Sequence, residues 1–195
     1  IWLNTDKKRC NSLFDHGIHS PKNLLDNYIN YFLNVPGIFE LNKEGEAFET
    51  DNNFGEILTK LNHRGLLDEH YILTFLRQIF TNVRLKRIVE IRGADRTPEG
   101  LEIAPAAFWV GLFNVNAVRM KVLEEISSWT TKDRSLFNNS GFYLDQNQKG
   151  PKDMSFGFWI KYFSQLSLDG LKHESIKEFH LLKEFLDDVF LKGPF

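Results

Sequence analysis

The residues with the clearest capacity for chemistry lie between Val83 and Asp95, where charged and apolar side chains alternate ahead of a glycine. Successive side chains of a β-strand point to opposite faces, so we expect a strand that ends at Gly93. One face would carry Arg84, Lys86, Ile88, Glu90 and Arg92. Glu90 and Arg92 would then lie roughly 6.5–7 Å apart, at about 3.3 Å per residue. That separation suits a metal ligand beside an anion-binding arginine, and it suits a salt bridge nearly as well.

This segment is basic, although the chain as a whole is slightly acidic. Residues 84–96 hold five basic and two acidic side chains, a local charge of +3, whereas the whole chain has a net charge of −2 and a pI near 6.3. A concentrated positive patch in such a chain favours a small anionic ligand over nucleic acid or an anionic membrane. Solvated surface charge is the alternative.

Composition indicates one folded domain or a large piece of one, because 42% of the 195 residues are hydrophobic and 18 are Phe. Cys10 is the only cysteine, which excludes an intrachain disulfide and fits a reducing, cytoplasmic setting. No apolar run approaches the 18 residues that a membrane span needs. The sequence begins at Ile1 without Met or a signal-peptide pattern, so we expect a fragment of a longer protein.

Hydrophobic periodicity predicts an α+β front half and a helical back half. In the front half we expect helices from Pro21 to Phe32, over 51–61 and over 68–79, the last of them capped by Asp68. We also expect a short strand at 38–41, followed by a turn at 42–45. In the back half we expect one long helix over 105–126, a short helix over 132–136, and two closing helices over 156–166 and from Ser175 to Gly193. Residues 137–154 are rich in Asn, Gly, Gln and Asp, which predicts a loop or a poorly ordered segment.

Several segments resemble the glutamate–cysteine ligase family of the plant and proteobacterial type. Residues 88–95 contain the family's E-x-R-G-A-D block, and residues 104–112 resemble its P-A-F-W-V-G-L segment. Residues 1–9 look like its opening I-W-T-D segment, residues 26–36 like its Y-V-D-Y-A-L-D-V-P, and residues 122–134 like a segment ending W-T-x-E-E-R. The likeness runs through almost the whole chain and thins after Leu136.

The resemblance implies a fold, a reaction and partners. The fold would be part of a glutamine-synthetase-like catalytic domain with antiparallel strands, formed by residues 1–103 and supported by a helical buttress over 104–195. The reaction would join glutamate to cysteine: ATP phosphorylates the γ-carboxylate, and the amine of cysteine attacks the acyl phosphate. The implied partners are ATP, Mg²⁺ and these small substrates, with no nucleic acid and no membrane.

The resemblance also implies roles for individual residues. Glu90 would be a Mg²⁺ ligand, and Arg92 would be the catalytic arginine that holds the substrate carboxylate or the γ-phosphate. Arg9 would bind the substrate carboxylate, or be an ordinary surface arginine. Arg84 and Lys86 would add positive potential at the nucleotide site.

Three departures from the family pattern leave alternatives open. Arg96–Glu99 replaces the family's G-G-P-W, Phe75 stands where the family usually has His, and Phe113–Val115 replaces L-Y-D. A non-catalytic interaction or regulatory module on the same scaffold is one alternative, and a ligase that joins glutamate to another amine is a second. The family's other metal carboxylates belong to a portion before this chain, so we expect the 195 residues alone to be inactive.

Overall fold

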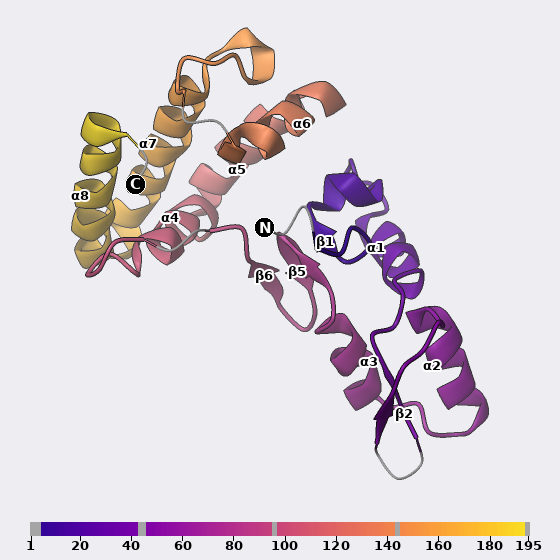
Figure 1. Ribbon diagram of the computed structural model, residues 1–195. Coiled ribbons are helices and arrows are strands. Elements are labelled where there is room, and N and C mark those ends of the chain that lie inside the picture. Colours follow the sequence, from indigo (N-terminus) through magenta and orange to yellow (C-terminus); the bar gives the residue numbers. More distant parts are fainter. Residues whose placement is uncertain (1–4, 43–45, 95–96, 143–144, 194–195) are drawn as a thin grey trace. The chain divides into compact units, whose positions relative to one another are not determined.

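The computed structural model describes residues 5–42, 46–94, 97–142 and 145–193. The chain forms two compact units, Ile1–Gly93 and Ala94–Phe195, each of which is described by itself (Figure 1). The predicted α+β class and the helical C-terminal half are confirmed. In the part of the chain described, no helix is long and apolar enough to cross a bilayer.

The described part of the first unit combines α-helices and one short 3-10 helix with pairs of short strands. Its elements are β1 (Cys10–Asn11), η2 (Leu13–His16), α1 (Leu24–Leu33), β2 (Glu40–Leu41), β3 (Ala47–Phe48), α2 (Phe54–His63), α3 (Glu69–Leu76), β4 (Phe80–Thr81), β5 (Val83–Leu85) and β6 (Val89–Ile91). β2 pairs with β3 and β5 with β6, both antiparallel, whereas β1 and β4 are parallel. The expected turn at 42–45 lies mostly outside the described residues.

The helices of the first unit enclose an aromatic and aliphatic core. Phe54 and Ile79 have no exposed surface, and the Phe54 ring packs between those of Phe32 and Phe75. The core further contains Val35, Ile57 and Leu58. Helix ends are set by side chains, since Asn53 caps α2 and Asp68 caps α3 by accepting backbone N–H bonds. The predicted cap at Asp68 is therefore confirmed.

The second unit is helical. It comprises α4 (Ala104–Phe113), α5 (Asn116–Ser127), α6 (Thr131–Asn139), η3 (Ser140–Phe142), η4 (Pro151–Asp153), α7 (Phe156–Glu174) and α8 (Ile176–Lys192). Helices α7 and α8 run side by side in Figure 1 and both contact α4. The predicted loop at 137–154 is wrong in part, because α6, η3 and η4 reach into it; residues 143 and 144 lie outside the described residues.

The single long helix predicted over 105–126 is two helices, α4 and α5. The chain leaves the helical conformation at Val115, whose φ and ψ are −81° and 116°. Arg119 stabilises the break, since its Nη1 donates to the Phe113 carbonyl at 2.6 Å and its Nη2 to Asn116 Oδ1 at 2.8 Å. An apolar stripe continues through the break, so periodicity alone could not reveal it.

Helices α4 and α7 cross at two glycines. A Cβ built on Gly170 would lie 2.0 Å from the Gly111 carbonyl oxygen, and one built on Gly111 would lie 2.2 Å from the Ser167 carbonyl oxygen. Ser167 Oγ donates to the Phe108 carbonyl at 2.8 Å across the same crossing. The backbones can approach this closely only because both positions lack side chains.

Candidate functional site

The charged segment is a β-hairpin, not the continuous strand that was predicted to end at Gly93. Lys86–Ile88 form its turn, where the Lys86 N–H donates to the Ile88 carbonyl at 2.9 Å. The turn contains no Gly, Pro or Asn, so the usual sequence signals of a hairpin are missing. Arg84 and Glu90 are directly opposite each other in the two strands. Cross-strand pairing therefore puts the charged side chains on one face, as predicted, although they come from two paired strands and not from one continuous strand.

Glu90 is the centre of this charged group. Its Oε2 accepts from Arg84 Nε at 2.6 Å and lies 3.9 Å from Arg92 Nη1, while its Oε1 accepts from Lys86 Nζ. The hydrogen bonds from Arg84, and then from Lys86, lower the pKa of Glu90 to about 2. The carboxylate is therefore ionised at every physiological pH.

Arg84 is buried and fastens the hairpin to the end of α3. Its Nη1 donates to the carbonyls of Arg77 at 2.8 Å and Ile79 at 2.9 Å, in addition to the bond from Nε to Glu90. Helix α1 contacts the same strand, because the Leu85 N–H donates to the Tyr28 hydroxyl at 3.2 Å. These bonds make Arg84 a residue that orients Glu90; its contact with a nucleotide stays a prediction, as does that of Lys86.

Arg92 has weaker polar contacts than the other cations of this group. Its Nε is buried and has no hydrogen-bond partner among the residues that the structure describes. The guanidinium lies over the Phe80 ring, with Cζ 5.6 Å from the ring centroid. Burial and the nearby Arg84 lower the pKa of Arg92. Arg84, Lys86 and Arg92 together exceed Glu90 by two positive charges, so the geometry favours an incoming anion.

Arg9 belongs to a separate network within the first unit. All three of its guanidinium nitrogens are engaged: Nε by Asp6, Nη1 by the Gln78 carbonyl at 3.4 Å and Nη2 by the Pro36 carbonyl at 2.7 Å. It is buried, so it is not the surface arginine that was one of the two alternatives. These bonds hold the segment before β1 to the segments that follow α3 and α1; substrate binding by Arg9 stays a prediction.

The described residues do not by themselves make a metal site. No group of three or more His, Cys, Asp or Glu that could hold an ion occurs among them. Glu90 is one carboxylate facing three cations, a surrounding that repels a second cation unless further anionic groups are added. The predicted magnesium contact of Glu90 stays a prediction, and Asp95 lies outside the described residues.

Two buried polar atoms near β1 were not predicted from the sequence. Tyr31 Oη and Asn11 Oδ1 are buried and, as far as the structure describes the chain, form no hydrogen bond. The Tyr31 ring stacks on His16 at 4.2 Å between centroids, and His16 Nε2 is 2.6 Å from the Cys10 carbonyl oxygen. Burial raises the pKa of Tyr31, so its hydroxyl remains a donor. A tyrosine one turn after the core residue Tyr28 was the available sequence signal.

An α+β unit with a positively charged hairpin is compatible with enzymes that act on carboxylates and phosphates. A family model identifies the class of protein. The model of glutamate-cysteine ligase family 2 matches residues 1–144. The chain belongs to this family, which confirms the resemblance inferred from the residues.

Named relatives extend the likeness beyond residue 144. The chain is 30% identical to a chloroplastic glutamate–cysteine ligase of Nicotiana tabacum over 97% of its own length and 36% of the relative's. It is 31% identical to the enzyme of Arabidopsis thaliana over 99% of its own length and 37% of the relative's. The chain thus spans little more than a third of the length of these relatives.

Proposed function

We propose that this chain is part of an ATP-dependent ligase that forms γ-glutamylcysteine from glutamate and cysteine. Membership in the family and the names of the relatives support a glutamate–cysteine ligase. The single observation that supports a site for this reaction is the buried Nε of Arg92, which has no hydrogen-bond partner among the described residues, beside a hairpin with two excess positive charges. We further propose a cytoplasmic enzyme, whereas the relatives named above are chloroplastic.

Arg92 would hold an anionic group of the substrate, either a carboxylate of glutamate or the phosphoryl group in transfer. A guanidinium offers parallel N–H donors that match two oxygens of such a group. Its lowered exposure strengthens the attraction, because fewer water molecules compete for the bond. Phe80, beneath the guanidinium, fixes the plane of the fork.

Arg84 and Lys86 would keep Glu90 ionised and in place, and Glu90 would orient Arg92 through its weaker contact at 3.9 Å. The family's chemistry needs ATP, and Mg²⁺ to neutralise the phosphoryl oxygens. We assign both to the complete enzyme. Glu90 is the carboxylate that the charged hairpin would provide toward such an ion.

ADP release tests the proposal. The full-length protein should release ADP in the presence of ATP, Mg²⁺ and glutamate only when a suitable amine is added. Cysteine should be the best amine in a panel that also contains 2-aminobutyrate, serine and glycine.

Two results would contradict the proposal in different ways. ADP release that is independent of cysteine but dependent on another amine would change the acceptor and keep the ligase. No ADP release with any amine would favour the non-catalytic module. We also propose that the 195 residues alone do not turn over, which the same assay on the isolated chain checks.

A further inference from the structure

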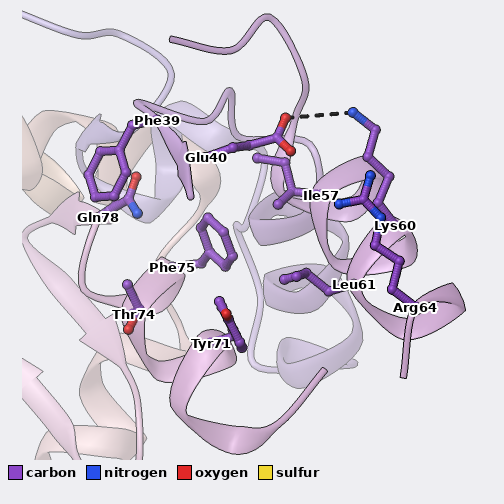
Figure 2. A pocket seen from close by; sticks show the side chains of 10 residues that line it. All are labelled: Phe39, Glu40, Ile57, Lys60, Leu61, Arg64, Tyr71, Thr74, Phe75 and Gln78. Carbon is purple, nitrogen blue, oxygen red and sulfur yellow. Dashed lines mark ion pairs between the residues drawn. The ribbon is translucent and has the colours of Figure 1, made fainter. Parts of the chain in front are cut away.

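Two side-chain amides of the first unit lie in very different surroundings. Gln78 is buried in a pocket between α2, α3 and the start of β2 (Figure 2). The cavity volume there is about 30 Å³, which is room for one or two water molecules, so this pocket can take water and not a substrate. Asn82, in contrast, is exposed at the end of the charged hairpin.

Asn82 stands directly before β5 and opposite Arg92. Val83 pairs with Ile91 in the register of the hairpin, so the next position outward pairs Asn82 with Arg92, whose N–H donates to the Asn82 carbonyl at 2.7 Å. Directly opposed residues of an antiparallel pair have their side chains on the same face, with Cβ atoms roughly 4.5–5.5 Å apart. A Cβ built on Gly93 would lie 3.6 Å from the Asn82 Cβ. Asn82 therefore extends the charged face of the hairpin beside Arg92.

The carboxamide of Asn82 is available to a ligand. Its oxygen and nitrogen form no hydrogen bond with any residue in the part of the chain that the structure describes. The backbone that carries it is held on both sides, since its N–H donates to the Asn11 carbonyl at 2.9 Å and its carbonyl accepts from Arg92. An asparagine so placed offers two N–H donors and an acceptor oxygen from a fixed position.

The charged face attracts a carboxylate and repels an ammonium group. Arg84, Lys86 and Arg92 are all donors, and both carboxylate oxygens of Glu90 already accept, Oε2 from Arg84 and Oε1 from Lys86. The Arg92 side chain is 27% exposed, so a substrate carboxylate can reach it. A substrate ammonium group would meet three cations, and the Asn82 side-chain oxygen is a neutral acceptor beside them.

We propose that Asn82 and Arg92 together bind the α-amino acid end of glutamate: Arg92 holds the α-carboxylate, and the side-chain oxygen of Asn82 accepts from the ammonium group. An α-amino acid carries both groups on one carbon, so two neighbouring side chains can bind them together. The inference rests on the proposed ligase function, and it assigns Arg92 to the substrate carboxylate and not to the phosphoryl group. Asn82 is then the residue that distinguishes an amino acid from a simple dicarboxylate.

Competition between glutamate and glutarate in the full-length protein tests the proposal, because glutarate is glutamate without the ammonium group. Asn82→Ala should raise the Michaelis constant for glutamate about fivefold or more and change the inhibition constant of glutarate less than about twofold, since only glutamate loses a charge-assisted hydrogen bond. A merely structural role of Asn82 would weaken both ligands equally. The matched control is Asn147→Ala, which alters an exposed asparagine of the second unit and should change neither constant.

Calorimetry on the unmodified protein gives a second measurement that needs no variant to fold, and glutamate should bind more tightly than glutarate. Equal binding of the two ligands, an unchanged Michaelis constant in Asn82→Ala, or equal weakening of both ligands would overturn this proposal and leave the ligase intact. If the unmodified protein releases no ADP with glutamate and any amine, the proposed function itself fails, and this inference fails with it.

Discussion

Arg84 should stabilise the fold more than the exposed charged residues of the same hairpin do. Arg84→Met keeps much of the apolar stem and removes the guanidinium. The change leaves the carbonyls of Arg77 and Ile79 without their shared donor, and it leaves Glu90 with Lys86 and the more distant Arg92. Removal of one partner of a buried ion pair costs about 3–5 kcal/mol. The Glu90 side chain is 24% exposed, so water offsets part of this, and we expect a loss of about 3 kcal/mol.

The matched control is Arg87→Met on the same hairpin. Arg87 pairs with Glu69 at 2.7 Å, but both side chains are about two-thirds exposed, so the loss should be within about 1 kcal/mol. Urea denaturation followed by circular dichroism measures the global free energy of unfolding. Hydrogen exchange of the peptides that cover residues 77–92 localises the effect to the first unit. Equal losses for the two variants would refute the view that Arg84 is a structural anchor.

Three further perturbations test other parts of the structure. Glu90→Gln should destabilise most at neutral pH. The pKa of Glu90 in the folded protein, about 2, lies below its unfolded value of about 4.3. The stabilisation by the ionised carboxylate is therefore present above about pH 4.3 and is lost as the pH falls toward 2. A difference in the free energy of unfolding between the variant and the unmodified protein that stays constant from about pH 7 to 2 would contradict this. Gly170→Ala should lower the free energy of unfolding by at least about 1–3 kcal/mol, since its Cβ would meet the Gly111 carbonyl. Gly141→Ala is the control: the space around Gly141 is open, so urea denaturation should show almost no change in the free energy of unfolding. Asn53→Ala should lower the free energy of unfolding by about 1 kcal/mol, because Asn53 Oδ1 no longer accepts from the Glu56 N–H group. A loss below about 0.3 kcal/mol would show that this cap does not stabilise α2.

Helices were predictable from sequence where a stripe and a capping residue agreed. Asp68 shows this at α3, since the capping residue stands directly before the helix and three positions before its first apolar residue, Tyr71. The break between α4 and α5 was not predictable, because the bonds that stabilise it come from Arg119, one turn into the next helix. A local bond from a side chain to the backbone leaves no periodic signal.

The candidate site was predictable in its charges and not in its geometry. Alternation of charged residues correctly placed Arg84, Glu90 and Arg92 on one face, although the strand is a hairpin. The sequence could not predict that the Gln78 amide and the Tyr31 hydroxyl are buried and lack hydrogen-bond partners among the described residues. Whether a buried polar group finds a partner depends on packing between segments that are distant in sequence.

The Michaelis constant for glutamate is the most direct test of the role given to Arg92. In the full-length protein, Arg92→Gln should raise it at least tenfold, because a charged partner of the substrate is removed. Arg87→Gln, on the outer part of the same hairpin, should leave it unchanged. If Arg92→Gln binds and turns over glutamate as the unmodified protein does, the hairpin is not the anion site and the account is contradicted.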